Sequence, residues 1–201
     1  DTATITGPYE SKGPLSKYFD KSYDDLYFGT KTWELAEVKL IEESIDILLN
    51  KMELTKFDVD VLVSGDLLNQ IVATNYAASS LGIPLIGIYG ACATSVLGLI
   101  VASNMIEAKQ VKNAITATSS HNNAAEKQFR YPVEYGGPKR KTTTFTSTGG
   151  ASAYLSSNKK GIKIESATLG TVVDLGITDV CHMGAVMAPA AAKTIYDHLR
   201  E

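Results

Sequence analysis

The sequence is poor in cysteine, histidine and tryptophan, and it has no long apolar run. The two cysteines, Cys92 and Cys181, lie far apart without CxxC spacing, which argues against structural zinc and a disulfide framework and favours a reduced, intracellular setting. No apolar run approaches the roughly 18 residues that span a bilayer, and residues 1–5 lack a basic segment followed by an apolar one. We therefore expect neither a membrane span nor a secretory signal, and we expect any membrane association to be peripheral, through a partner.

The chain also lacks an excess of charge of either sign. Its formal net charge is −3, and the one dense basic cluster, Lys139-Arg140-Lys141, is too short to indicate nucleic-acid binding. Of its 201 residues, 44% are hydrophobic and 20% are charged, which is typical of a globular protein with its own core. We expect a single domain over residues 1–201 and no nucleic-acid partner.

Hydrophobic periodicity predicts four helices. They cover residues 32–52, 67–81, 92–108 and 124–127. In the first, apolar and acidic residues recur at helical spacing, and Thr30 or Thr32 is placed to cap the start. The third has no charged residue before Glu107, so we expect it to be a buried central helix.

Short apolar or β-branched runs predict strands between these helices. The predicted strands cover residues 59–63, 84–89, 114–119, 142–147, 151–156 and 162–170. Residues 7–30 combine turn residues with aromatic ones and are expected to form an irregular arm that packs on the domain. Strands that alternate with helices are typical of an α/β fold with a mainly parallel, mixed sheet, here with antiparallel strands at the end.

The segment from Leu85 to Ser95 runs from an apolar strand through a glycine turn to a cysteine at an expected helix start. Helix starts have unpaired N–H groups and a partial positive charge, which stabilise a thiolate and attract anions. Cys92 is therefore a candidate for chemistry or for ligand binding. The same pattern also fits a small buried cysteine that only packs, which is what we expect of Cys181.

A second polar cluster, residues 119–123, follows a predicted strand. Its side chains are expected at the carboxyl end of the sheet, where α/β proteins commonly bind ligands. His121 could bind an anion, orient a base or cap the following turn. Further along, Arg130–Gly137 with Lys139 and Arg140 combines aromatic, basic and turn residues, which fits a lid, an oligomer contact or a solvated loop. No phosphate-binding glycine motif and no calcium-loop spacing is present, so we expect no metal site.

Two motifs resemble the first half of the thiolase and ketoacyl-synthase III fold. They are Gly90-Ala91-Cys92-Ala93-Thr94-Ser95, in which the nucleophilic cysteine of that family matches Cys92, and Ser147-Thr148-Gly149-Gly150-Ala151-Ser152-Ala153. Longer runs across nearly the whole chain resemble the stage V sporulation protein AD family. These runs are Gly65–Gln70, Ala117–Asn122, Gln128–Pro132, Glu134–Gly137 and Met187–Ala192.

The resemblance implies a non-enzymatic protein that binds dipicolinic acid, alone or as its calcium chelate, for uptake into the developing bacterial spore and release in germination. It implies a peripheral place at the spore inner membrane, in a complex with other proteins of the stage V sporulation A operon, with homodimerisation left open and no cofactor. Dipicolinate is a small, flat dianion, which suits a helix N-terminus and a few polar or basic side chains. The expected ligand-binding residues are Cys92, Ser119, His121, Asn122 and Arg130.

Two other functions fit the same residues. The first is acyl transfer by a condensing enzyme with Cys92 as nucleophile. It is disfavoured because thiolase chemistry needs a histidine with an asparagine, or two histidines, from the second half of the duplicated fold, and the chain resembles an N-terminal fragment without that half. If the chain does not catalyse acyl transfer, Cys92 occupies a vestigial nucleophile position. The second is an assembly role, in which the loop from Arg130 to Arg140 builds a dimer.

Overall fold

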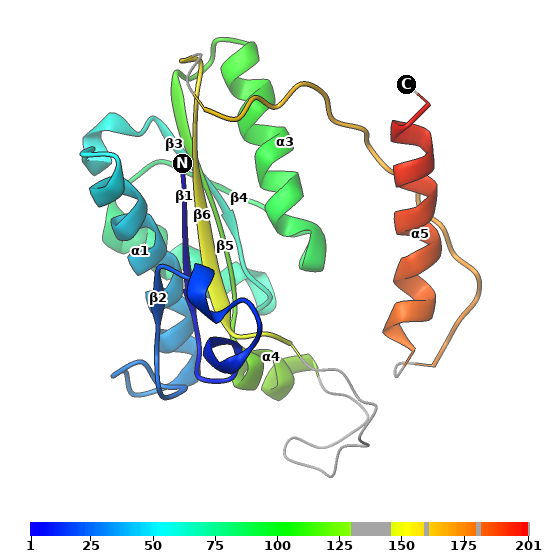
Figure 1. Cartoon of the computed structure of the whole chain (residues 1–201), viewed down its shortest axis with the longest axis horizontal. Coiled ribbons are helices and arrows are strands. Elements are labelled where there is room, and N and C mark those ends of the chain that lie inside the picture. The colour runs from blue at the N-terminus through cyan, green and yellow to red at the C-terminus, as the bar shows by residue number, and fades with distance from the viewer. Residues whose placement is uncertain (130–145, 159–160, 180–181, 201) are drawn as a thin grey trace. The chain divides into compact units, whose positions relative to one another are not determined.

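The computed structural model describes residues 1–129, 146–158, 161–179 and 182–200 (Figure 1). By contacts the chain divides into two compact units, of which the larger comprises residues 1–139 and 144–161 and the smaller residues 140–143 and 162–201. A division by contacts does not decide whether the two units fold together, so the expectation of a single domain stays a prediction.

A mixed sheet forms the centre of the larger unit. Within the described residues its strands are β1 (Thr2–Thr6), β2 (Lys21–Ser22), β3 (Val61–Gly65), β4 (Leu85–Gly87), β5 (Asn113–Ser120) and β6 (Gly149–Ser156). Their order is β2-β1-β6-β5-β3-β4. β3 runs parallel to β4 and β5, and β1 parallel to β2, whereas β6 is antiparallel to both β1 and β5. The predicted α/β class with a mixed sheet is confirmed.

The helices follow the predicted pattern with shifted ends. The described helices of the larger unit are α1 (Trp33–Lys51), α2 (Val72–Leu81), α3 (Thr94–Glu107) and α4 (Asn122–Phe129). The hydroxyl of Thr32 caps α1 by accepting a hydrogen bond from the Leu35 N–H at 3.2 Å. α2 begins later than predicted because Gln70 and Ile71 have φ values of 58° and 48°, which a right-handed helix cannot include.

Helices cover both faces of the sheet. α1 and α3 lie on opposite sides of it (Figure 1). Leu62 of β3 packs in the core with α1 and α2, whereas Val61 and Val63 pack with Ala102 of α3. Every residue of β3 is buried, as expected for a strand between two helical layers.

α3 is less buried than its lack of charge predicts. Within the described residues it buries one stripe, formed by Thr94, Gly98 and Ala102, and Val96 is 57% exposed. Gly98 lies against Thr116 of β5, so that the sheet meets the side of the helix with small residues. The absence of charge indicates a helix that avoids water, but it does not indicate how much of the helix one sheet covers.

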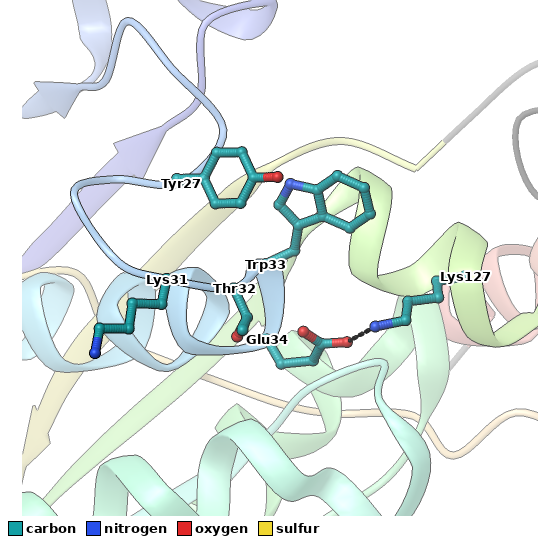
Figure 2. A pocket seen from close by; sticks show the side chains of 6 residues that line it. All are labelled: Tyr27, Lys31, Thr32, Trp33, Glu34 and Lys127. Carbon is teal, nitrogen blue, oxygen red and sulfur yellow. Dashed lines mark hydrogen bonds and ion pairs between the residues drawn. The ribbon is translucent and has the colours of Figure 1, made fainter.

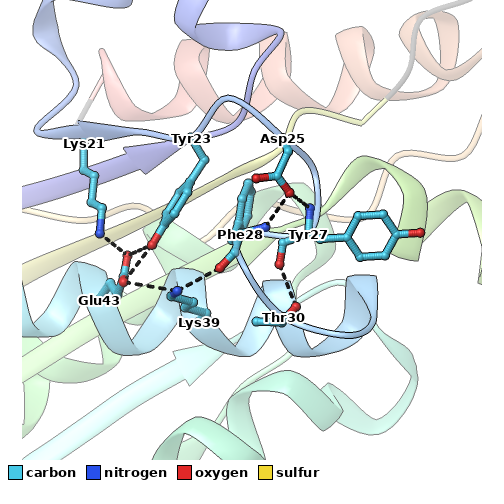
Figure 3. A network of polar contacts seen from close by, with 8 residues as sticks. All are labelled: Lys21, Tyr23, Asp25, Tyr27, Phe28, Thr30, Lys39 and Glu43. Atoms are coloured by element: carbon cyan, nitrogen blue, oxygen red, sulfur yellow. Dashed lines mark hydrogen bonds and ion pairs between the residues drawn. The ribbon is translucent and has the colours of Figure 1, made fainter.

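The N-terminal arm packs on α1, as predicted. The Tyr23 hydroxyl donates to the carboxylate of Glu43 at 2.6 and 2.7 Å, and the Lys39 Nζ donates to the Phe28 carbonyl at 2.8 Å (Figure 3). The rings of Tyr23 and Phe28 stack with centroids 4.5 Å apart, and Phe28 is fully buried. The arm is thereby anchored to one helix by polar and aromatic contacts.

Three segments differ from the sequence prediction. β1 was not expected, because its stability depends on pairing with β6, about 150 residues away in the chain. The strand predicted over residues 162–170 is wrong, since the described residues there form no strand. α5 (Met183–His198), in the smaller unit, was not expected either. The strand predicted over residues 142–147 lies mostly outside the described residues.

Gly65, at the end of β3, has no room for a side chain. A Cβ atom there would lie 2.0 Å from the Ile88 carbonyl oxygen and 2.9 Å from Cγ2 of Thr94. We expect Gly65→Ala to lower the free energy of unfolding by about 2–3 kcal/mol, because backbone must move to admit the methyl group. Gly184→Ala is the control, since within the described residues no atom outside its chain neighbours and the backbone of its own helix lies within 4 Å of its Cβ position. Urea unfolding tests this, and equal midpoints for Gly65→Ala and the wild type would contradict it.

Candidate functional site

Three parallel strands bring the predicted polar segments to one edge of the sheet. β3 ends at Gly65, β4 at Gly87 and β5 at Ser120, and Ser64 is in register with both Gly87 and Ala117. The loops that follow these strands carry Asp66, the turn around Cys92, and His121. The carboxyl ends of parallel strands are the usual ligand side of an open α/β sheet, so we take this edge as the candidate site.

Cys92 lies in an exposed turn immediately before α3. The turn, Ala91–Ala93, is a single 3-10 turn in which Ala91 has a φ of 46°. The buried Thr94 clamps it: its hydroxyl accepts from the Gly90 N–H at 3.0 Å and donates to the Ala91 carbonyl at 2.8 Å. The thiol is thus held at the start of α3, as predicted, and faces solvent rather than core.

His121 is completely buried beneath the N-terminal arm. Its Nε2 bonds to the Leu26 carbonyl at 2.7 Å, and its Nδ1 accepts from the Ala124 N–H at 3.3 Å. Because a carbonyl can only accept, Nε2 carries a hydrogen, and because Nδ1 accepts from an N–H, Nδ1 carries none. The ring is therefore neutral. The Phe28 ring packs edge-on against the imidazole at 5.7 Å. Burial lowers the pKa of His121 below its usual value of 6.5.

Ser119 and Asn122 are also engaged within the protein. The Ser119 hydroxyl donates to Oε1 of Glu37 at 3.2 Å. The Asn122 N–H donates to the Thr148 hydroxyl at 2.9 Å, and its side-chain amide donates to the Thr146 carbonyl at 2.9 Å. The structure therefore brings Ser119, His121 and Asn122 together and ties them to neighbouring segments of the chain. Their roles as ligand-binding residues stay predictions, and Arg130 lies outside the described residues.

Two buried carboxyl groups at this edge were not singled out from the sequence. Glu37 of α1 is fully buried, and burial together with the charge of Asp66 raises its pKa to about 8. Asp66 accepts from the Leu68 N–H at 2.8 Å and from the Thr74 N–H at 2.7 Å, so that it fixes the loop before α2. Burial raises the pKa of Asp66 as well, against these hydrogen bonds.

A sequence signal for Glu37 exists. It lies in the stripe of α1 that buries Leu40, Ile41 and Ser44, at helical spacing from each of them. An acidic residue within the apolar stripe of an amphipathic helix indicates a buried carboxyl with a specific partner. Asp66 offers the weaker signal of an acidic residue directly after a buried strand.

A shallow hollow of about 210 Å³ lies at the start of α1. Figure 2 shows its lining, which consists of Tyr27, Lys31, Thr32, Trp33, Glu34 and Lys127. The Lys127 Nζ pairs with Oε1 of Glu34 at 2.7 Å, and this hydrogen bond lowers the pKa of Glu34. The rings of Tyr27 and Trp33 lie 5.8 Å apart. Sequence reasoning did not identify this hollow.

Within the described residues, no group of three or more His, Cys, Asp or Glu side chains is arranged to hold a metal ion. Of the helices that the structure describes, none combines the length and hydrophobicity needed to cross a bilayer. The exposed start of α3 presents the positive end of the helix dipole at this edge, which favours an anion.

Comparison with known proteins identifies the family. A sequence model of stage V sporulation protein AD matches residues 1–201. The chain belongs to the stage V sporulation protein AD family. It is 50% identical to the stage V sporulation protein AD of Bacillus subtilis (strain 168) over 198 residues. That alignment covers 98% of this chain and 59% of the relative, so the chain spans less than two thirds of the relative's length.

Solved structures agree on the fold. The 3-oxoacyl-[acyl-carrier-protein] synthase III of Aquifex aeolicus VF5 is similar with a TM-score of 0.51 and 14% identity, over 79% of this chain and 53% of that one. The β-ketoacyl-[acyl carrier protein] synthase III of Thermus thermophilus has a TM-score of 0.50 and 14% identity, over 70% of this chain and 40% of that one. The tetronic acid condensing enzyme AbyA1 has a TM-score of 0.51 and 15% identity, over 69% of this chain and 43% of that one. At this identity the likeness shows the fold alone, which is the predicted thiolase-like one.

The neutral state of His121 predicts a loss of stability in acid. Its folded pKa is below the unfolded value of 6.5, so as the pH falls below about 6.5 the unfolded chain takes up a proton that the folded chain does not. We expect the free energy of unfolding to decline more steeply toward pH 5 in the wild type than in His121→Gln, by about 1 kcal/mol.

Urea unfolding at several pH values measures this difference. The matched control is His182→Gln, which changes an exposed histidine and should keep the acid dependence of the wild type. Parallel pH profiles for the wild type and His121→Gln would show that His121 is not held neutral.

Proposed function

We propose that this chain binds dipicolinic acid, alone or as its calcium chelate, without catalysing a reaction. The binding would serve uptake into the developing spore and release in germination. Membership of the stage V sporulation protein AD family supports a role in sporulation. The ligand is the one that the resemblance to this family implies, and the chemistry of the candidate site is compatible with it.

The observation that carries the proposal is the open start of α3. No side chain caps this helix, its first turn contains no acidic residue, and Ala91, Cys92 and Ala93 before it are exposed. The positive end of its dipole is therefore accessible to a carboxylate, although the N–H groups of Ala93 and Thr94 already donate to the carbonyls of Gly90 and Ala91. A small, flat dianion can approach such a turn closely because alanine side chains leave the backbone accessible.

Ser119, His121 and Asn122 have a supporting part in this proposal. Their polar groups already bond to the arm, to α1 and to the segment before β6, so they would shape the edge of the sheet beside the α3 start. Arg130 remains a proposed ion-pair partner for a ligand carboxylate.

We also propose a peripheral place at the spore inner membrane, within a complex formed with other proteins of the stage V sporulation A operon. A partner would supply the membrane attachment. Calcium, if it is co-bound, would arrive as part of the chelate, and homodimerisation stays open.

The test is calorimetric titration of dipicolinate, with and without calcium, into the wild type, Cys92→Glu and Cys92→Gln. We expect saturable binding by the wild type, and binding at least about tenfold weaker in Cys92→Glu, because a new carboxylate at the helix start repels the dianion. Cys92→Gln has nearly the same size without the charge, and it should bind much more tightly than Cys92→Glu.

Isophthalate is the matched ligand control, since it keeps the two ring carboxylates but lacks the ring nitrogen that completes the calcium chelate. A wild-type chain that is folded but binds neither compound would overturn the proposal for this part of the protein. Equal affinities of the glutamate and glutamine variants would place the ligand away from α3.

Acyl transfer is a second candidate, favoured by one observation: the Cys92 thiol is exposed at a helix start in a fold shared with condensing enzymes. A nucleophilic thiol of that kind reacts unusually fast near neutral pH because it is deprotonated. We expect instead that Cys92, in a Cys181→Ser background, is alkylated by iodoacetamide at no more than about ten times the rate of a cysteine in an unstructured peptide. A rate more than about tenfold higher would favour the enzyme.

A further inference from the structure

Glu37 connects α1 to two strands at the candidate edge. Its Oε1 accepts from the Ser119 hydroxyl of β5, and the backbone of Leu67, in the loop after β3, also hydrogen-bonds to its carboxyl group. Its other oxygen, Oε2, is buried and has no hydrogen-bond partner. An ionised carboxylate rarely leaves a buried oxygen unpaired, because the loss of hydration is then uncompensated.

Within the described residues, the groups that act on Glu37 include no cation. Asp66 follows the end of β3 and accepts from the N–H of Thr74 in α2, and Ser119 is in β5, the strand next to β3. Asp66, Thr74 and Ser119 are all buried. We call these residues together with Glu37 the Glu37 cluster.

Within the part of the chain that the structure describes, the charged groups that act on Glu37 are both acidic. Asp66 faces it from the end of β3, and Glu34 lies one turn earlier on α1. Neither α2 nor β5 contributes a charged group to the cluster. Glu34 is itself paired with Lys127 of α4, so that this lysine is engaged at the surface rather than at Glu37. Two like charges and burial together disfavour a negative charge on Glu37.

We propose that Glu37 is held as a neutral carboxylic acid and acts as the positioning residue for the segment Ser119–Asn122, which loosens when Glu37 ionises. The neutral acid can share hydrogen bonds with Ser119 without a buried charge. The ionised form would be repelled by Asp66, and the contact between α1 and the end of β5 would weaken. The segment that follows Ser119 contains His121 and Asn122. The proton on the Glu37 carboxyl group therefore holds these two residues in place at the edge of the sheet.

The direction of the pH dependence follows from the raised pKa. A folded pKa of about 8, against 4.5 in the unfolded chain, means that the unfolded chain loses this proton first. The free energy of unfolding therefore falls as the pH rises from about 4.5 to about 8, and the change is complete above that range. The segment should be tightly held in mild acid and looser in mild alkali.

The first measurement uses infrared spectra of the wild type with isotope-labelled glutamate. A protonated glutamic acid has a carbonyl stretch that a carboxylate lacks, and the label separates it from Asp66. We expect one such band at about pH 6.5, lost with a midpoint near pH 8 and absent from Glu37→Gln at every pH. Glu42→Gln, the same change at a partly exposed position on α1, should keep the band. A wild type without the band would overturn the proposal, and this result needs no variant to fold.

The second measurement is amide hydrogen exchange over Ser119–Asn122, corrected for the intrinsic dependence of exchange on pH. We expect protection in the wild type and in Glu42→Gln to fall at least about fivefold between pH 6.5 and pH 9, and protection in Glu37→Gln to stay constant. A purely structural Glu37 would give the same pH dependence in all three proteins, which would contradict a positioning role.

Any effect of Glu37 on ligand affinity rests on the proposed function. Dipicolinate titrations at pH 6.5 and pH 9 therefore distinguish the role of Glu37 from the binding of dipicolinate. Weaker binding at pH 9 in the wild type but not in Glu37→Gln is expected if both hold. With no dipicolinate binding at either pH, the proposed function fails, while the infrared and exchange results still decide the role of Glu37.

Discussion

The packing of α1 across the sheet is the interaction on which the rest of the larger unit depends. This helix contacts β1, β5, β6 and α2, so it joins strands that are far apart in the sequence. The close approach requires Gly150 of β6, where a Cβ atom would lie 2.7 Å from the Leu40 carbonyl oxygen. Lys39 and Glu43 of the same helix anchor the N-terminal arm (Figure 3). A single amphipathic helix thus supports the core, the arm and, through Glu37, the candidate edge.

The carboxyl edge combines a rigid base with an exposed turn. His121 is neutral and bonded to the arm, and Asp66 is occupied by two backbone N–H groups. The turn at Cys92, at the same edge, has exposed residues and a backbone that Thr94 clamps. Such an arrangement suits an anion, because the positive end of the α3 dipole is fixed in direction before the ligand arrives.

Local patterns predicted most of the fold. The apolar stripe and Thr32 cap of α1, the β-branched run of β3 and the glycine turn before Cys92 each carry a signal within a few residues. The failures share a physical cause. β1 forms because β6 offers it a partner, and α2 starts late because Asp66 binds the N–H groups of Leu68 and Thr74 and so holds the loop apart from the helix. Neither effect leaves a local periodicity, because β6 is distant in the chain and Asp66 acts through single hydrogen bonds to residues two and eight positions ahead.

By itself the sequence determined the family, the α/β class and the order in which strands and helices follow one another, because these depend on motifs and periodicities that are local in the chain. It also identified Cys92 at a helix start and the polar residues after β5. Only the tertiary structure decided which of these groups face water and which face protein: Cys92 is exposed, whereas His121 is covered by the arm and Glu37 faces Asp66 in the core. Burial and charge pairing arise when distant segments meet, and these two effects shift the pKa values of His121, Asp66 and Glu37 at the candidate edge.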